Sequence, residues 1–272
     1  MNNKILILGK GFIGTRIKEE LNCDITSQNI NSFKDLVGLI DEYSPGVIIN
    51  CVGHTGENVD QCEADRDKTL TANVFVPIML AEAAFRYKIK LVHISSGCIY
   101  HFDYQNQKPI SEDQPADFFD LFYSRTKIYS ERALTALADK KNILILRIRI
   151  PLDNRPHPKN ILTKLLSFEK ILDCQNSLTY IPDFIEALKY LINIDAWGIY
   201  NVVNRGSLRY SELLDIYKKY FPDFNYSLTN AAELGLIRTN LILSVNKLEK
   251  SGFKIREIHE VLEQCIEKYL TH

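Results

Sequence analysis

Continuous apolar runs alternate, along the first half of the chain, with segments whose apolar residues recur every three or four positions. The runs predict strands at 4–9, 23–27, 46–53, 90–96 and 142–150. The segments between them predict helices at 11–21, 33–43, 69–87 and 123–139. Because most of these strands are apolar throughout, helices should cover both of their faces. The order therefore predicts an α/β protein of the Rossmann type, with a doubly wound parallel sheet.

The pattern changes after Pro151. Residues 152–160 are rich in proline, asparagine and charge, which predicts a loop. Beyond it we expect helices and one strand at 161–172, 180–192, 198–204 (the strand), 211–221 and 255–270. The sequence therefore predicts two domains. A dinucleotide-binding domain would comprise 1–152 and 178–204, and a small, discontinuous, mainly helical cap would comprise 153–177 and 205–272.

The composition disfavours several classes of protein but does not indicate a function. The 272 residues are 46% hydrophobic and 25% charged, with a net charge of −1 and no basic block. These values disfavour nucleic-acid and membrane partners, and no apolar run is long enough for a signal peptide or a membrane span. Six scattered cysteines favour a cytoplasmic location over a disulfide framework. A zinc site from Cys51, His54 and Cys62 is disfavoured because the spacing does not match known zinc motifs.

A glycine-rich turn joins the first predicted strand to the first predicted helix. Gly9, Gly11 and Gly14 form G-x-G-x-x-G, with Phe12 and Ile13 between the last two glycines. The first glycine allows a tight turn, the second lets backbone N–H groups approach a pyrophosphate, and the third lets helix and strand pack closely. The position between strand and helix favours dinucleotide binding over a glycine turn without a ligand.

The second strand bears on the choice of cofactor. The acidic residue that holds the adenosine ribose of NAD is not evident, since Asp24 lies early in this short strand. Thr26, Ser27 and Gln28 lie where a 2′-phosphate would sit. The sequence therefore favours NADPH, with NADH as the alternative.

A tyrosine and a lysine stand four positions apart at the start of a predicted helix. Tyr123 and Lys127 therefore share one face, and an ammonium near a phenol favours the phenolate. The phenol could then donate a proton to a developing alkoxide near neutral pH. Ser96, at the end of the preceding strand, could hydrogen-bond the same oxygen. The alternative for the pair alone is a solvated helix face.

Taken together, the glycine motif, the strand-end serine and Y-x-x-x-K resemble the extended short-chain dehydrogenases/reductases. Asn73 matches the helix asparagine of that catalytic group, the alternative being a polar residue that bends a helix. Residues 44–55 resemble the corresponding strand and loop of dTDP-4-dehydrorhamnose reductases. This resemblance implies that Cys51, Val52 and Gly53 contact the cofactor, together with Lys127, and that His54 contacts substrate.

Segments further along resemble one branch more closely, the nucleotide-rhamnose synthases with epimerase and reductase activity. They are YSRTK (123–127), LRIRIP (146–151), 158–179 and GIYNVVN (198–204). In that branch a cysteine two positions after the hydroxyl residue serves as an acid/base in epimerisation, and Cys98 matches it here. The resemblance implies Lys164 as its partner, and His157 is a rival acid/base. The alternatives are a small buried thiol and a solvated lysine.

Three readings of function follow. The first is an NADPH-dependent 3,5-epimerase/4-reductase that converts an NDP-4-keto-6-deoxy-hexose to an L-deoxysugar nucleotide of the UDP- or dTDP-L-rhamnose type. The second is a simple 4-reductase, and the third is a dinucleotide-binding regulatory subunit. Lys159, Asn160 and Arg238 could meet the diphosphate, because cations and amides suit phosphate oxygens, although each could equally lie on the surface. By analogy with the family, helices 69–87 and 123–139 would form a homodimer.

Overall fold

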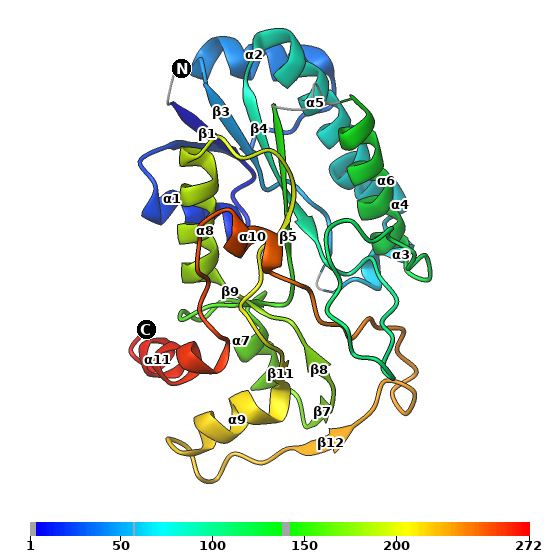
Figure 1. Ribbon diagram of the computed structural model, residues 1–272, viewed down its shortest axis with the longest axis vertical. Helices are drawn as coiled ribbons and strands as arrows, with labels where there is room; N and C mark the ends of the chain where they lie inside the picture. Colours follow the sequence, from blue (N-terminus) through cyan, green and yellow to red (C-terminus); the bar gives the residue numbers. More distant parts are fainter. Residues whose placement is uncertain (1–3, 57, 138–141) are drawn as a thin grey trace. The chain divides into compact units, whose positions relative to one another are not determined.

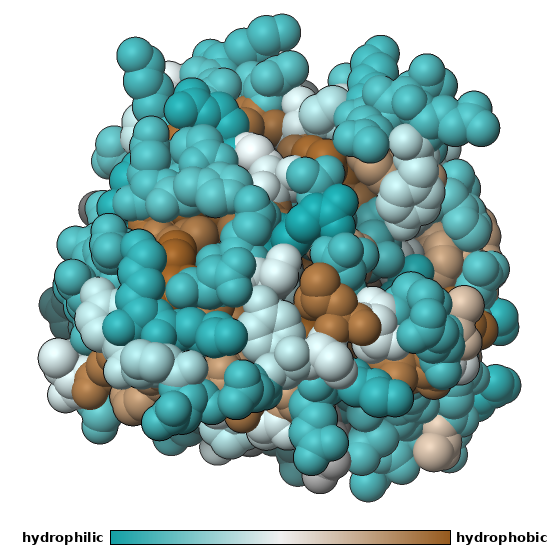
Figure 2. Space-filling view, turned by 90° about the horizontal axis from the view of Figure 1, so that it is seen from below, coloured by the Kyte–Doolittle hydropathy of each residue, from teal (hydrophilic) through white to brown (hydrophobic). Residues whose placement is uncertain are grey.

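The computed structural model describes residues 4–56, 58–137 and 142–272, and these divide into two compact units. The first unit comprises 1–99, 118–147 and 191–200, and the second comprises 100–117, 148–190 and 201–272. In the described part of the chain no helix is both long and apolar enough to cross a membrane. The face shown in Figure 2 is mostly hydrophilic, and its apolar residues form small patches that are separate from one another.

The first unit is built on a six-stranded sheet in the order β10-β5-β4-β3-β1-β2. Its strands are β1 (Ile5–Leu8), β2 (Asp24–Thr26), β3 (Val47–Asn50), β4 (Lys90–Ser96), β5 (Ile143–Ile148) and β10 (Gly198–Asn201). Its helices are α1 (Phe12–Glu20), α2 (Phe33–Tyr43), α3 (Gln61–Ala64), α4 (Arg66–Leu70), the π-helix η1 (Thr71–Phe75), α5 (Val76–Tyr87) and α6 (Phe122–Leu137). This arrangement confirms the predicted Rossmann-type fold.

Apolar residues of α2, α5 and α6 pack against one face of the sheet and form its core. The packed set includes Leu36 and Leu39 of α2, Leu80 of α5, Leu134 of α6 and Ile48 of β3. In Figure 1, α5 and α6 lie side by side along this face, and α1 lies on the other side, where the chain passes from β1 to β2. The buried apolar strands therefore have the two-sided cover that their composition requires.

Parallel pairing brings the carboxyl ends of neighbouring strands to one edge of this sheet. Leu8 of β1 pairs with Thr26 of β2 and with Asn50 of β3, and Asn50 pairs with His93 of β4. The strand order changes direction between β1 and β3, because β2 lies on one side of β1 and β3 to β5 on the other. In sheets of this kind ligands bind outside the carboxyl ends at such a point.

The second unit has its own apolar core and short strand pairs. Its elements are β6 (Pro151–Leu152), α7 (Ile161–Leu165), β7 (Lys170–Leu172), β8 (Gln175–Asn176), β9 (Thr179–Tyr180), β11 (Leu208–Arg209), α9 (Tyr210–Lys218), β12 (Ser227–Thr229), α10 (Asn246–Lys250) and α11 (His259–Leu270). Helix α8 (Ile181–Asn193) begins in this unit and ends in the first. The pairs are β6 with β9, β7 with β12 and β8 with β11.

The structure departs from the predicted elements and boundaries at several places. Predicted helix 161–172 is wrong in its second half, where β7 pairs with β12 instead. Predicted helix 69–87 contains a π-helical turn, and positions 138–139 of predicted helix 123–139 lie outside the described residues. Four segments predicted for the dinucleotide-binding domain belong to the second unit by their contacts: 100–117, 148–152, 178–190 and 201–204. Within the first of them, Ile110 pairs with Leu243.

Candidate active site

The glycine-rich turn has the geometry that a dinucleotide loop requires. Gly9 has a φ of +102°, and a Cβ there would lie 3.1 Å from the backbone of Cys51 and Val52. A Cβ on Gly14 would lie 2.0 Å from the carbonyl oxygen of Gly9, so helix and turn could not pack. A Cβ on Gly11 would meet nothing within 4 Å, which leaves room beside the first turn of α1. Gly9 and Gly14 are therefore packed closely against backbone. Gly11 has free space beside it, where a pyrophosphate could approach backbone N–H groups.

The end of β2 carries hydroxyl groups and no acid. The Gly9 N–H donates to the Thr26 carbonyl at 2.9 Å, so the turn lies against this strand end. Asp24 is at the other end of β2, where it pairs with Lys4 at 3.4 Å. Ser27 is exposed, and so is Lys10, a cation within the glycine turn that the sequence analysis did not consider. These groups suit a 2′-phosphate better than a free 2′-hydroxyl.

The buried amide of Asn73 holds the loop that follows β3. Its Oδ1 accepts the His54 N–H at 2.8 Å, and its Nδ2 donates to the His54 carbonyl at 3.1 Å and to Thr126 Oγ1 at 3.2 Å. Thr126 Oγ1 in turn donates to the Tyr123 carbonyl at 2.7 Å. Asn73 lies in the π-helical turn η1, a distortion frequent at functional sites. The asparagine therefore ties the loop to the first turn of α6.

Tyr123 and Lys127 lie together, almost fully buried, on α6. Their exposed fractions are 8% and 4%, and the Lys127 Nζ lies 5.9 Å from the centre of the Tyr123 ring. Burial lowers the pKa of Lys127 to about 8, against the opposing effect of the Glu131 carboxylate. A Cβ on Gly53 would lie 3.7 Å from the same Nζ, so the loop after β3 reaches this lysine. Tyr123 and Lys127, which were predicted to lie together, therefore meet the loop after β3 at the carboxyl edge of the sheet.

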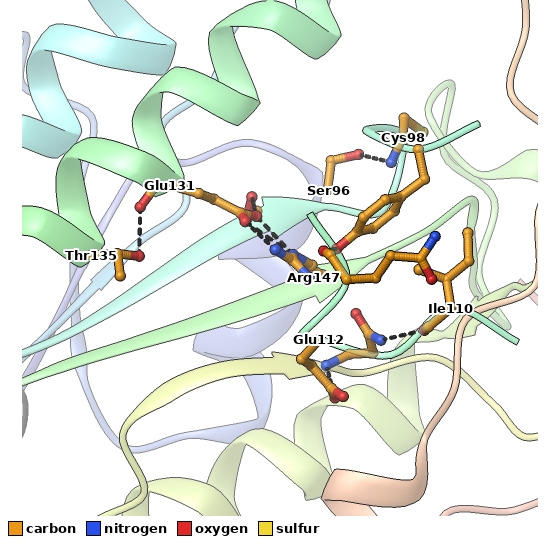
Figure 3. A network of polar contacts seen from close by, with 11 residues as sticks. Ser96, Cys98, Ile110, Glu112, Glu131, Thr135 and Arg147 are labelled. Atoms are coloured by element: carbon orange, nitrogen blue, oxygen red, sulfur yellow. Dashed lines mark hydrogen bonds and ion pairs between the residues drawn. The ribbon is translucent and has the colours of Figure 1, made fainter. Parts of the chain in front are cut away.

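Ser96 and Cys98 form a short, well-held turn at the end of β4. The Ser96 Oγ accepts the Cys98 N–H at 3.1 Å, and Ser124 Oγ donates to the Cys98 carbonyl at 2.6 Å. Figure 3 shows Ser96 turned toward the backbone of Cys98. Since Ser124 adjoins Tyr123, the same contacts fix the cysteine turn to the start of α6. The Cys98 side chain is half-buried rather than enclosed in the core.

His54, Cys51 and Cys62 lie near one another, and the described residues around them give no sign of a metal site. The His54 Nε2 lies 3.4 Å from an oxygen of Asp65, and the Cys62 Sγ donates to the His54 carbonyl at 3.5 Å. Burial raises the pKa of Cys51 to about 12, so this thiol stays protonated near neutral pH. Within the described residues no group of three His, Cys, Asp or Glu side chains could hold a metal ion.

The substrate residues predicted from the later segments all lie in the second unit. Lys164 is half-buried on α7, Lys159 is exposed, and Arg238 is half-buried, with its guanidinium donating to the Ile237 carbonyl at 2.7 Å. The pKa of His157 is lowered by partial burial and by nearby Lys159. Their predicted roles remain predictions.

Asn160 has a structural role that was not predicted, and its role as a phosphate ligand stays a prediction. It has no exposed surface. Its Oδ1 accepts the Leu162 N–H at 3.2 Å, which caps α7, and its Nδ2 donates to the carbonyls of Asp153 at 2.8 Å and Arg155 at 2.9 Å. Asparagine is a favoured N-cap, and this use of both amide atoms explains the short loop before α7.

A buried charged network next to Lys127 was not predicted from the sequence. Glu131, four positions further along α6, receives hydrogen bonds from Ser95 Oγ at 2.5 Å and from the Arg147 guanidinium at 2.6 Å. Figure 3 shows Glu131 and Arg147 pointing toward one another from α6 and β5. The i, i+4, i+8 spacing of Tyr123, Lys127 and Glu131 and the arginine within an apolar strand were both visible signals.

A second missed pair is Asn50 and His93, at the paired ends of β3 and β4. Asn50 Oδ1 accepts the Val52 N–H, and its Nδ2 lies 3.0 Å from His93 Nδ1. Because Nδ2 can only donate, His93 Nδ1 must accept, so the proton lies on Nε2. Burial and the Lys127 charge lower the pKa of His93 well below its usual value. The pair therefore orients the backbone that leads into the cofactor loop.

These groups are well suited to proton transfer at a carbonyl oxygen. A buried phenol beside a buried ammonium can deliver a proton to a carbonyl oxygen while that oxygen gains charge. The open glycine turn could hold a dinucleotide at the same edge of the sheet. A half-exposed thiol on an adjoining turn adds a second group able to move protons.

Several known proteins resemble this chain in sequence. A bifunctional dTDP-4-dehydrorhamnose 3,5-epimerase/reductase of Arabidopsis thaliana is 29% identical, over 87% of this chain and 81% of its own length. A trifunctional UDP-glucose 4,6-dehydratase/3,5-epimerase/reductase of the same plant is 28% identical over 95% of this chain, which spans 41% of that protein.

Solved structures agree with the fold. The L780 UDP-rhamnose synthase of Acanthamoeba polyphaga mimivirus has a TM-score of 0.91 at 22% identity, over 98% of this chain and 100% of that one. A dTDP-4-dehydrorhamnose reductase of Bacillus anthracis, crystallised with NADP, has a TM-score of 0.85 at 24% identity, over 98% and 99%. The model of the RmlD substrate binding domain matches residues 3–212. The chain therefore belongs to the RmlD substrate binding domain family, within the extended short-chain dehydrogenases/reductases that the sequence predicted.

Proposed function

We propose that this chain is an NADPH-dependent 3,5-epimerase/4-reductase that acts on an NDP-4-keto-6-deoxy-hexose and yields an L-deoxysugar nucleotide of the UDP- or dTDP-rhamnose type. The chain is an oxidoreductase of nucleotide sugars, as its relatives are by name. The observation that carries the proposal is the buried Tyr123–Lys127 pair, held by Asn73 at the edge of the sheet where the glycine turn opens.

The reduction uses Tyr123 as proton donor. When bound, NADPH supplies the hydride that reduces the C4 carbonyl carbon. The Tyr123 hydroxyl gives its proton to the C4 oxygen, and the ammonium of Lys127 stabilises the phenolate that remains. Ser96 lies at the end of the adjoining strand and can hydrogen-bond the same oxygen. The product is a C4 alcohol, and the tyrosine recovers its proton from solvent.

The epimerisation uses Cys98 as an acid/base. The C–H bonds at C3 and C5 are acidic because each adjoins the C4 carbonyl, and the enolate oxygen needs a hydrogen-bond donor while it exists. The Cys98 side chain is half-buried, so a substrate could approach the thiol, and a thiol is a chemical group able to take and return a proton. Return of a proton to the opposite face inverts the carbon. Lys164 stays the proposed partner on the resemblance of its segment alone.

NADPH is the proposed cofactor because the protein groups at the end of β2 suit a phosphate. Thr26 and Ser27 offer a hydroxyl each, Lys10 offers a positive charge, and the acid that would repel a phosphate is absent from this strand end in the described chain. NADH should therefore bind more weakly than NADPH.

A single assay in D₂O distinguishes the proposed function from its alternatives. We would incubate the protein with NADPH and UDP- or dTDP-4-keto-6-deoxyglucose and analyse the sugar by mass spectrometry and NMR. The proposal predicts deuterium at C3 and C5 together with oxidation of NADPH. Oxidation only with an already epimerised ketone would identify a simple 4-reductase. Binding of the dinucleotide without any turnover would identify a regulatory subunit and contradict the enzymatic proposal.

A homodimer through α5 and α6 is also part of the proposal. Phe85 of α5 and Tyr129 of α6 are 57% and 52% exposed, which is high for large apolar side chains. A second copy of this pair of helices would cover them. Light scattering should give twice the mass of one chain, and Tyr129→Glu should halve it; a monomeric wild-type protein would contradict this proposal.

A further inference from the structure

We propose that Glu131 is a positioning residue for the reduction: held by Ser95 and Arg147, it keeps the ammonium of Lys127 charged beside Tyr123 and sets the pH above which activity falls. The inference rests on the proposed reductase function, because it assigns the support of that same site. Glu131 itself would touch neither sugar nor cofactor.

The contacts place Glu131 where it can act only through its neighbours. Its side chain is 6% exposed and Arg147's is 4% exposed, so the ion pair at 2.6 Å is shielded from water and salt. Ser95, adjacent to the predicted catalytic serine, donates to the same carboxylate at 2.5 Å. The carboxylate is therefore held from β4 and β5 while its own helix carries Lys127 one turn earlier.

Among the described residues, Glu131 is the carboxylate that supports the positive charge of Lys127. Two thiols, Cys51 after β3 and Cys62 on α3, also act on the pKa of Lys127. Burial raises the pKa of both thiols, so both are neutral at neutral pH. His93 on β4 is also neutral, because burial and the Lys127 charge lower its pKa.

Burial keeps the lysine poised rather than permanently charged, and Arg147 limits how far Glu131 can oppose that effect. A carboxylate shared with a guanidinium stabilises a nearby ammonium less than a carboxylate alone would. Burial opposes the charge on Lys127, Glu131 supports it, and the pKa settles at about 8. The result is a lysine that is protonated at neutral pH yet loses its charge under mildly alkaline conditions.

The test measures the titration of Lys127 directly, without substrate. Protein labelled with ¹³C at lysine Cε would be titrated by NMR, with the Lys127 signal assigned by its loss in Lys127→Arg. Glu131→Gln keeps the shape of the side chain and removes its charge. We expect the midpoint of Lys127 to fall by roughly one pH unit or more, the size of effect a nearby opposite charge has.

The sign of the shift separates this role from a purely structural one. If Glu131 only held the packing, its loss would admit water to Lys127 and the midpoint would rise. A rise or no change would therefore overturn the proposal. Glu131→Asp, which keeps the charge, should restore the midpoint in part, and it replaces the glutamine variant if that variant does not fold. Glu82→Gln, in the exposed pair with Arg86 on α5, is the matched control and should change nothing.

Kinetics then separate failure of the inference from failure of the proposed function. In an active enzyme, the alkaline limb of the kcat/KM profile should move to lower pH in Glu131→Gln, in step with the NMR midpoint. An active enzyme whose limb does not move would contradict the inference alone. A protein that shows the NMR shift but no turnover with any nucleotide sugar would contradict the proposed function and leave the Glu131–Lys127 coupling in place.

Discussion

Lys127 carries a charge that its surroundings oppose. Its pKa lies at about 8 in the folded protein, below the ordinary 10.5, because burial disfavours the ammonium. Between these two values the unfolded chain holds a proton that the folded chain has lost, so stability increases as pH rises through this range. At neutral pH the buried charge therefore costs about 3 kcal/mol, from about 1.4 kcal/mol for each unit of pKa.

Replacement of Lys127 by an apolar residue should make the protein more stable but inactive. We expect Lys127→Met to raise the free energy of unfolding at pH 7 by roughly 1–3 kcal/mol and to abolish reduction. Urea unfolding of both proteins at pH 7, 8.5 and 9.5 would measure the difference, which should shrink as pH rises. A difference independent of pH, or a less stable variant at every pH, would contradict the assigned cost of the buried charge.

Cys98 should matter for one half of the reaction and not for the other. We expect Cys98→Ala to lose exchange of deuterium into C3 and C5 while it still reduces an already epimerised ketone at near the normal rate. The reason is that, in the proposed mechanism, the thiol moves carbon-bound protons, whereas Tyr123 gives its proton to the C4 oxygen. Mass spectrometry after incubation in D₂O measures both. Cys174→Ala, a half-buried cysteine of the second unit, is the control, and exchange that survives in Cys98→Ala would show the thiol assignment to be wrong.

Residues of the site could be predicted where chemistry demands a fixed spacing along the chain. Tyr123 and Lys127 share a helix face, and Ser96 ends a strand that the apolar pattern marks. Asn73, inside a helix, was assigned from its resemblance to the helix asparagine of the family. Contacts between distant elements could not be predicted in the same way. The Ser95–Glu131–Arg147 network joins two strands and a helix, and the second role of Asn160, as a cap, depends on where its helix begins.

At the scale of elements, the glycine turn offers two substitutions with opposite consequences. Gly14→Ala would place a Cβ 2.0 Å from the Gly9 carbonyl oxygen, so it should destabilise the unit and abolish NADPH binding. Gly11→Ala meets no protein atom within 4 Å, so its unfolding should be nearly unchanged. It should still weaken NADPH binding, because a methyl group there crowds the approach of the pyrophosphate.

Thermal melts and NADPH titration by fluorescence would measure both effects. Gly38→Ala, on the exposed side of α2 with no neighbour within 4 Å, is the control. It should bind NADPH normally and gain up to about 1 kcal/mol of stability, since glycine is a poor residue inside a helix. Normal NADPH affinity in Gly11→Ala would show that the dinucleotide does not use this turn.

Most strands and helices of the sheet unit were predictable because each is long, apolar and flanked by turns. The second half of predicted helix 161–172 was not. The segment ILTKLLSFEKIL has helical spacing throughout, yet α7 ends at Leu165 and Lys170–Leu172 forms β7. The partner of β7 is β12, far along the chain, so pairing rather than local preference decides its conformation.

At the scale of the whole molecule, the candidate site residues are divided between the two units. The first unit holds the glycine turn, the Tyr123–Lys127 pair and Cys98, and the second holds Lys159, Lys164 and Arg238. The sequence predicted two domains that interleave along the chain, with 100–117 in the first of them. It placed 100–117 with the sheet because these residues follow β4 directly, whereas Glu112 Oε1 accepts the N–H of Asn201 and Ile110 pairs with Leu243.

The central claim is that Tyr123 delivers a proton while the dinucleotide delivers hydride to C4 of the sugar. The most direct measurement uses NADPH deuterated at C4 of the nicotinamide, with the epimerised 4-keto sugar nucleotide as substrate. Wild-type protein should place the deuterium at C4 of the sugar, and Tyr123→Phe should do so at least 100-fold more slowly, the usual range for loss of a general acid. Transfer by Tyr123→Phe at the wild-type rate, or deuterium found elsewhere in the product, would contradict the account.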